Sequence, residues 1–218
     1  MDRSTGWKVV SAIEFLVAAA VIILDLVQPT LVILAMIVLS LLARRDRPST
    51  LGLKRLDNFP RMLAVVLGLV IVWQLFHLSV SMPVLNRLTW ATQDLSDFEN
   101  LKGNVGQLAL LLVLSWTLAG FGEELVYRGY LQARLTDFLG LGRNGVILAV
   151  AASSVLFGLA HREQGLIGVV VTTMDAVFFS ALKWRYGNNL WAAVLAHALS
   201  NTIGLVAFFF LGPIFGFW

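Results

Sequence analysis

The residues best suited to chemistry in this chain lie in three short clusters, and each cluster falls within or at the end of a long apolar stretch. They are Glu123, Glu124 and Arg128 in the first cluster, His161 in the second, and His197 with Asn201 in the third. A charged side chain at the centre of a membrane helix costs roughly 2.5 to 3.5 kcal/mol even on lenient insertion scales. Such residues therefore need partners or a water-filled cavity, and we take these clusters as the candidate site.

Helical spacing determines which of these side chains share a face. Glu124 and Arg128 are four residues apart, so on a helix they can form a buried ion pair that fixes its register. Glu123 is rotated from Glu124 by about 100° and points elsewhere. His197 and Asn201 are also four residues apart, so their side chains converge on one volume that faces the interior of a helix bundle.

The depths of these residues can be compared along their helices. Glu123 lies 17 residues before the Gly140–Gly142 turn and His161 lies 19 residues after it. At about 1.5 Å per residue they sit roughly 26 and 29 Å from the same turn, so antiparallel packing brings them to a similar depth. His197 is 8 residues beyond Asn189, which leaves it shallower, at roughly 12 Å. Tilt or a kink must close that gap.

The elements that position these clusters are predicted to be membrane helices. The chain is 58% hydrophobic and 13% charged, with a mean hydropathy of +0.82, which is too apolar for an ordinary soluble domain. We predict an all-α polytopic transmembrane bundle of about seven spans, within a range of six to eight, in a single domain over residues 1–218. The predicted spans cover residues 9–26, 30–43, 62–80, 106–139, 144–161, 165–183 and 190–211. The second is short for a spanning helix, which requires about 20 apolar residues.

Two further features of the composition exclude other classes of protein. The first apolar run, beginning near Val9, lacks a small-residue cleavage site, so we expect a retained helix rather than a removable signal peptide. The chain contains no cysteine. Cysteine peptidase chemistry and disulfides are therefore excluded.

The distribution of basic residues predicts the orientation of the chain. With seven spans and a cytosolic N-terminus, twelve basic residues fall on the cytosolic side, three fall outside and Arg128 lies within a span. The twelve are Arg3, Lys8, Arg44, Arg45, Arg47, Lys54, Arg55, Arg61, Arg134, Arg143, Lys183 and Arg185, and the three are Arg87, Lys102 and Arg162. This asymmetry fits the positive-inside rule for a multi-pass protein, which we expect in a prokaryotic cell membrane. The basic loop at 44–61 is interpreted as a surface for anionic lipid headgroups, not for nucleic acid.

Three motifs in order resemble those of a known family. They are Glu-Glu-x-x-x-Arg at 123–128, Phe-x-x-x-His at 157–161 and His-x-x-x-Asn at 197–201. This order, with each motif on a separate span, resembles the CAAX prenyl protease and bacteriocin-processing (CPBP or Abi) family of intramembrane glutamate-type endopeptidases. The likeness covers a catalytic core of about residues 106–205, while the first hundred residues match only in being hydrophobic.

The resemblance implies that a peptide bond is hydrolysed inside the membrane. Water is a poor nucleophile toward an amide, so a base must take its proton and donors must hold the oxyanion. By motif match, Glu123 is the base and His161 helps to orient the water. His197 and Asn201 then stabilise the oxyanion. The expected substrate is a peptide or lipid-modified protein held in the membrane, either of the prenylated CAAX type or bacteriocin-like.

The remaining motif residues have expected supporting roles, and the motifs also allow a bound metal. The residues expected to brace the site from outside are Glu124, Arg128 and Phe157. Glu123, His161 and His197 have the composition of a catalytic zinc site with one open position. The sequence has no His-Glu-x-x-His motif, and we favour a metal-free site with zinc-dependent hydrolysis as the alternative.

Two other classes of function compete with an enzyme. One is a catalytically silent member of the same family that binds a membrane partner, as an immunity or scaffold protein would. The other is a transporter or proton relay, whose mark would be paired inverted repeats, and no internal repeat is evident. His77, Glu14 and Asp175 are further polar residues in the predicted spans but match no motif. Asp175 is expected either to line the same cavity or to pair with a cation.

Overall fold

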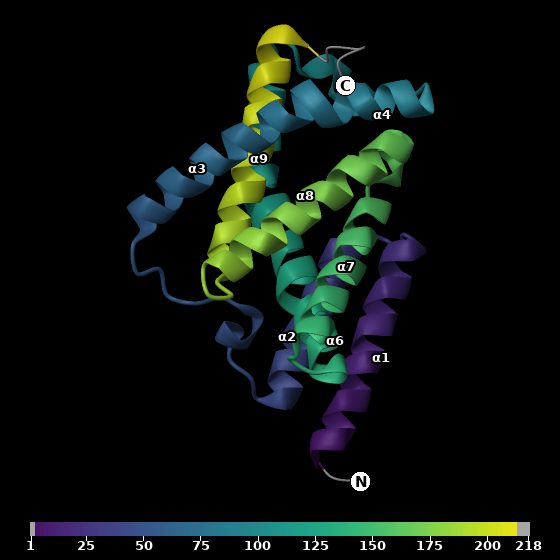
Figure 1. Cartoon of the computed structure of the whole chain (residues 1–218), viewed down its shortest axis with the longest axis vertical. Coiled ribbons are helices and arrows are strands. Elements are labelled where there is room, and N and C mark those ends of the chain that lie inside the picture. Colours follow the sequence, from purple (N-terminus) through teal and green to yellow (C-terminus); the bar gives the residue numbers. More distant parts are fainter. Residues whose placement is uncertain (1–2, 213–218) are drawn as a thin grey trace.

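The structure is a computed structural model that describes residues 3–212, and within these residues it contains helices and no strand (Figure 1). At the end of the molecule nearest the N-terminus lie α1 (Arg3–Ile23), α2 (Pro29–Arg44), α6 (Gln132–Leu139) and α7 (Arg143–Leu159). Toward the opposite end lie α3 (Phe59–Phe76), α4 (Met82–Thr89), α5 (Val105–Leu114) and the last turns of α9 (Leu190–Leu211). Between these groups α8 (Gly165–Arg185) runs obliquely across the middle of the molecule.

The predicted polytopic helical fold is confirmed. Between residues 3 and 212, five helical stretches are long and apolar enough to cross a membrane: Thr5–Ile23, Phe59–Thr89, Val105–Leu139, Arg162–Arg185 and Leu190–Leu211. The shorter apolar helices α2 and α7 correspond to the other two predicted spans. The third span is longer than predicted, because a π-helical turn at His77–Ser81 joins α3 to α4 instead of ending the helix.

The beginnings and ends of the helices follow local sequence signals. Pro29 occupies the first turn of α2, where its missing N–H removes no helical hydrogen bond. The Asn104 side chain caps α5 by accepting from the Gln107 N–H, and the Asn189 side chain caps α9 by accepting from the Trp191 N–H. Gly140, at φ +95°, ends α6 in a backbone conformation that favours glycine.

The exterior of the helices is apolar over much of its area. Leu16 on α1, Val72 on α3 and Phe210 on α9 are each more than 60% exposed. Large hydrophobic side chains exposed at this density on several helices would aggregate in water. Hydrocarbon is their natural solvent, and the chain is an integral membrane protein.

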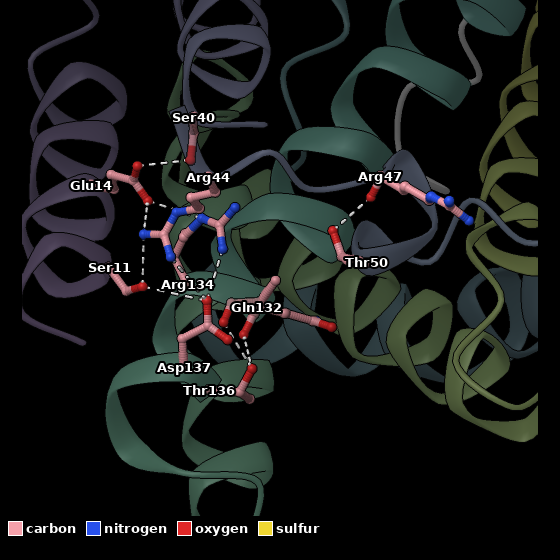
Figure 2. Close-up of polar contacts among 11 residues, drawn as sticks. Ser11, Glu14, Ser40, Arg44, Arg47, Thr50, Gln132, Arg134, Thr136 and Asp137 are labelled. Atoms are coloured by element: carbon pink, nitrogen blue, oxygen red, sulfur yellow. Dashed lines mark hydrogen bonds and ion pairs between the residues drawn. The ribbon is translucent and has the colours of Figure 1, made fainter. Parts of the chain in front are cut away.

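A polar network at the end nearest the N-terminus joins α1, α2 and α6 (Figure 2). Glu14 Oε2 lies 2.8 Å from an Arg44 nitrogen and 2.9 Å from Arg134 Nε, and Ser40 donates to Glu14 Oε1 at 2.7 Å. This network accounts for Glu14, which matched no motif. It also changes the interpretation of Arg134, which is 2% exposed in the bundle although it was counted among the cytosolic basic residues.

A continuous helix carries the first motif through the middle of the fold. Between α5 and α6, two π-helical segments, η4 (Ser115–Glu123) and η5 (Leu125–Leu131), make i→i+5 hydrogen bonds. Such wide turns occur frequently at functional sites. They enclose both glutamates of the motif, and α9 packs directly against η4.

Candidate active site

One cavity brings together all four residues predicted to do the chemistry. A cavity of about 370 Å³ is lined by Glu123 from η4, His161 from the turn after α7, and His197 and Asn201 from α9. Residues separated by more than 70 positions in the sequence therefore share one volume. The three motifs therefore converge on one cavity, as their order in the sequence predicted.

Small residues allow η4 to approach α9 closely beside this cavity. A Cβ built on Gly120 would lie 2.9 Å from Ala198 Cβ and 2.8 Å from the Ser115 carbonyl oxygen, so only glycine fits. Gly120 is three residues before Glu123, and Ala198 follows His197. The close contact thus places the glutamate and the histidine across one narrow interface.

The depth of His197 is explained without a kink. His197 would be shallower than Glu123 and His161 only if the turn before α9 lay level with the turn between α6 and α7. Figure 1 shows the α8–α9 turn nearer the middle of the long axis than the α6–α7 turn. The Leu190 N–H, at the start of α9, donates to the Gly52 carbonyl at 2.8 Å and anchors α9 there. Eight residues of helix from that starting point bring His197 to the cavity.

His161 is not on a helix, contrary to the prediction. α7 ends at Leu159, and His161 lies in the following turn with φ −109° and ψ 28°. Its N–H bonds to the Gly158 carbonyl at 2.9 Å, which tightens the end of the helix. The ring Nδ1 lies 2.8 Å from the Phe157 carbonyl oxygen, and a carbonyl can only accept. Nδ1 therefore carries a proton, and Nε2 is the ring atom left available to the cavity.

His197 is fixed on several sides. Its Nδ1 lies 2.8 Å from Glu124 Oε1. The Phe179 ring stacks on the imidazole at 5.1 Å and 17°, and the Phe157 ring meets its edge at 5.7 Å and 86°. The ring is 5% exposed. These contacts orient Nε2 as the atom that faces away from Glu124.

Glu124 and Arg128 form the ion pair expected from their spacing. Arg128 Nη1 lies 2.9 Å from Glu124 Oε1, and the two side chains are 1% and 0% exposed. The guanidinium carbon lies 4.3 Å from the centre of the Phe157 ring, which is a favourable cation–π distance. Glu124 thus joins Arg128 to His197 through one carboxylate oxygen, a connection that i, i+4 spacing alone did not reveal.

Glu123 is held differently from its neighbour. No ion pair or hydrogen bond of its side chain occurs within residues 3–212, and its buried Oε2 is left without a partner there. A buried carboxylate oxygen without a partner is costly. That oxygen is free to bind water or a substrate in the cavity.

Two residues that support the site were not predicted as such. Phe179 stacks on His197, but nothing in the sequence separates it from an ordinary core phenylalanine. Lys183 was counted as a cytosolic cation, yet it is 3% exposed and donates to the Arg128 carbonyl and to Gln132 Oε1. Its place at the end of an apolar run was the one feature of the sequence that could have indicated a buried lysine. It supports the π-helical segment that carries Arg128.

Glu123, His161 and His197 share one feature with a zinc site but lack another. Each imidazole leaves Nε2 available while Nδ1 is hydrogen-bonded, as in many zinc sites. However, no group of three His, Asp or Glu side chains in the described part of the chain gathers closely enough to hold a metal ion. In this structure Glu123, His161 and His197 therefore do not form a closed His₂Glu ligand set.

This geometry leads to an expected result with chelators. Cleavage by the purified protein should be unchanged after incubation with 1,10-phenanthroline, and elemental analysis should find zinc far below one atom per chain. A matched zinc peptidase, inhibited in the same tube, shows that the chelator is active. Loss of cleavage that zinc then restores would contradict the metal-free site.

The fold and the cavity define a class of protein, namely a polytopic membrane protein with a glutamate, two histidines and an asparagine in one intramembrane cavity. The family described as type II CAAX prenyl endopeptidase Rce1-like matches residues 105–203. This segment, which carries all three motifs, belongs to the CAAX protease and bacteriocin-processing family. The match supports a CAAX-type intramembrane endopeptidase in general terms. No curated protein and no solved structure gives a match to the chain.

Proposed function

We propose that the chain is an intramembrane endopeptidase that hydrolyses a peptide bond of a membrane-held substrate by a glutamate-activated water. The observation that carries this proposal is the shared cavity of Glu123, His161, His197 and Asn201. The charge distribution of the loops supports a cytosolic N-terminus, and we propose a single-domain protein of a prokaryotic cell membrane. Its partners are then the peptide substrate and membrane lipids, with no role in binding nucleic acid.

The first step of the proposed reaction is attack by water. Glu123 has an unpaired carboxylate oxygen at the cavity, so it takes the water proton as the oxygen attacks the scissile carbonyl carbon. His161 accepts the second water hydrogen at Nε2 and orients the lone pair for attack. When the C–N bond breaks, Glu123 returns its proton to the departing amine. The products are a new carboxyl terminus and a free amine.

The second requirement is to stabilise the oxyanion. The Asn201 amide supplies an N–H donor without any change of protonation. His197 already donates Nδ1–H to Glu124, so it donates from Nε2 only as the doubly protonated ring. The bond to Glu124 Oε1 holds the ring so that Nε2 points away from the carboxylate. The contact between Glu124 and His197 therefore supports the assignment of His197 to the oxyanion.

The walls of the cavity support a lipid-modified substrate. Leu111 and Leu114 on α5, together with Leu118 on η4, contribute an apolar wall near the polar residues. Such a wall accommodates an isoprenoid or aliphatic chain while the peptide bond meets the polar groups. The family acts on prenylated, membrane-associated proteins, and we propose a prenylated CAAX-type peptide as the first substrate to test, with a bacteriocin-like peptide as the alternative.

The proposed function predicts cleavage that depends on the lipid group. Purified protein in proteoliposomes should release the C-terminal fragment from a farnesylated CAAX peptide, detected by mass spectrometry. The same peptide without the farnesyl group should be cleaved far more slowly, because it does not partition into the bilayer. Proteoliposomes without the protein are the blank.

Other outcomes would contradict parts of the proposal. Tight binding of the farnesylated peptide by folded protein, without cleavage of it or of a bacteriocin-like peptide, would favour the catalytically silent alternative. Equal cleavage of the lipidated and unlipidated peptides would remove the membrane-held substrate from the proposal while leaving the hydrolysis in place.

A further inference from the structure

Asp175 lies in the same cavity as the motif residues although it belongs to no motif. It is on α8 and 23% exposed at the side chain, and it lines the cavity with Glu123 and His197. Its Oδ1 accepts from Trp73 Nε1 at 2.6 Å and lies 3.1 Å from His77 Nε2. Both partners come from the helix formed by α3 and the π-helical turn after it. The carboxylate is therefore held in one orientation by one oxygen.

The other oxygen of Asp175 is free of protein contacts. Oδ2 makes no hydrogen bond or ion pair with any residue between 3 and 212. His77 is itself satisfied, because its Nδ1 lies 2.6 Å from Ser81 Oγ. Trp73 is fixed by stacking on Phe178 at 4.7 Å and 10°. Because Trp73 and His77 hold Oδ1, Oδ2 is the carboxylate oxygen available to a ligand in the cavity.

Two more polar groups line the cavity near Asp175. Ser200 on α9 is 7% exposed, and its Oγ has no hydrogen-bond partner in the described structure. Gln74 on α3 reaches the Ser200 carbonyl with its Nε2 at 3.5 Å, which leaves its Oε1 without a partner among those residues. A buried hydroxyl without a partner is costly unless something else binds it. It is an observation independent of the carboxylate.

The position of Asp175 relative to the reacting groups follows from the helices. Asp175 lies four residues before Phe179, about 6 Å along α8, and Phe179 stacks on His197. Since α8 and α9 run in opposite directions at an oblique angle (Figure 1), Asp175 and Ser200 both lie beyond the Phe179–His197 contact from the turn that joins the two helices. A distance of about 6 Å spans about two residues of an extended peptide.

The charge of the cavity decides what binds there. Its lining includes two carboxylates, Glu123 and Asp175, and no lysine or arginine among the residues that the structure describes. The Asp175 carboxylate has no lysine or arginine beside it in this lining, so it attracts a positively charged group. An ammonium group has three N–H donors and no acceptor, which suits a carboxylate, an amide oxygen and a hydroxyl.

We propose that Asp175, with Gln74 and Ser200, forms a subsite for the ammonium group of a substrate lysine within about two residues of the scissile bond. The inference rests on the proposed endopeptidase function and names its substrate class, a peptide with a basic residue beside the cleaved bond. It also predicts that a glutamate at the same position is rejected. Asp175 is thus a specificity residue, and it takes no part in the proton transfers.

The test compares matched farnesylated peptides that carry Lys, Gln or Glu at each of the two positions on either side of the scissile bond. At one position the wild-type protein should prefer Lys over Gln by about tenfold in kcat/KM, the ratio that a hydrogen bond between charged groups supports. Asp175→Asn keeps Oδ1 as an acceptor for Trp73 and His77. Its ratio of kcat/KM for the Lys peptide to kcat/KM for the Gln peptide should fall to near unity. Asp57→Asn removes one negative charge in an exposed loop and is the matched control. It should keep the wild-type preference for Lys.

A binding measurement separates this inference from the proposed function. In Glu123→Gln protein the same peptides are compared by equilibrium binding, so the subsite is tested even if no peptide is cleaved. Lysine preference in binding or cleavage that disappears in Asp175→Asn supports the subsite. No preference at any position, or a preference that persists in folded Asp175→Asn, would overturn it.

Discussion

Replacement of Glu123 by glutamine is expected to lower kcat by about 10³-fold, within the range that a positioned general base contributes. The amide has nearly the same shape as the carboxylate but cannot take a proton from water. Because the Glu123 side chain makes no ion pair or hydrogen bond with the described residues, its replacement should leave the thermal unfolding temperature unchanged. The measurement is kcat on the farnesylated peptide, paired with a melting curve in the same detergent.

The matched control for this change is Glu99→Gln. Glu99 lies in the short 3₁₀ segment Ser96–Leu101, where its side chain is exposed. This variant removes one negative charge without touching the cavity and should behave as wild type. Undiminished turnover in Glu123→Gln would remove Glu123 as the base and, with it, the glutamate mechanism.

The transmembrane spans were predictable because they depend on composition over many residues. The last span was predicted to its end residues, 190–211, since the Asn189 cap precedes it and Gly212, with φ +79°, follows it. The third was underestimated. It was predicted to end at residue 80, whereas the structure buries His77 and Ser81 in a wide turn where they hydrogen-bond each other and the helix continues.

The candidate site was predictable as a set of residues but not in its detailed contacts. Motif order identified the four cavity residues, and the i, i+4 rule identified the Glu124–Arg128 pair. Helical periodicity could not reveal the π-helical segments or the contact between Glu124 and His197, because both depend on how η4 and η5 pack against α9. The catalytic roles of the four cavity residues stay predictions.

Contacts between helices that are far apart in sequence account for what was missed. Asp175 looked like an isolated acid inside a span, and its partners Trp73 and His77 are about a hundred residues away. The end of α7 before His161 depends on a tight turn that leads to Gly165, at φ +76°. An apolar run continuing to residue 161 gave no sign of that turn.

The adjacent glutamate is expected to act on stability. Glu124→Gln leaves the guanidinium of Arg128 buried without its counter-charge, since both side chains are at most 1% exposed. Breaking a buried pair by removing one partner typically costs about 3 to 5 kcal/mol of unfolding free energy. Activity should also fall, because a neutral amide holds the His197 ring less firmly than the carboxylate does. The measurement is reversible unfolding in mixed micelles, compared with wild type and Glu123→Gln.

A double variant separates the two effects of Glu124. Glu124→Gln combined with Arg128→Met removes both charges and keeps a long apolar side chain over Phe157, where the guanidinium lay. It should recover most of the lost stability, because no unpaired charge remains buried. Its turnover should stay low, since His197 still lacks the carboxylate at Nδ1. If Glu124→Gln unfolds like wild type, the ion pair does not hold this part of the bundle. If the double variant regains full turnover, Glu124 has no part in preparing His197.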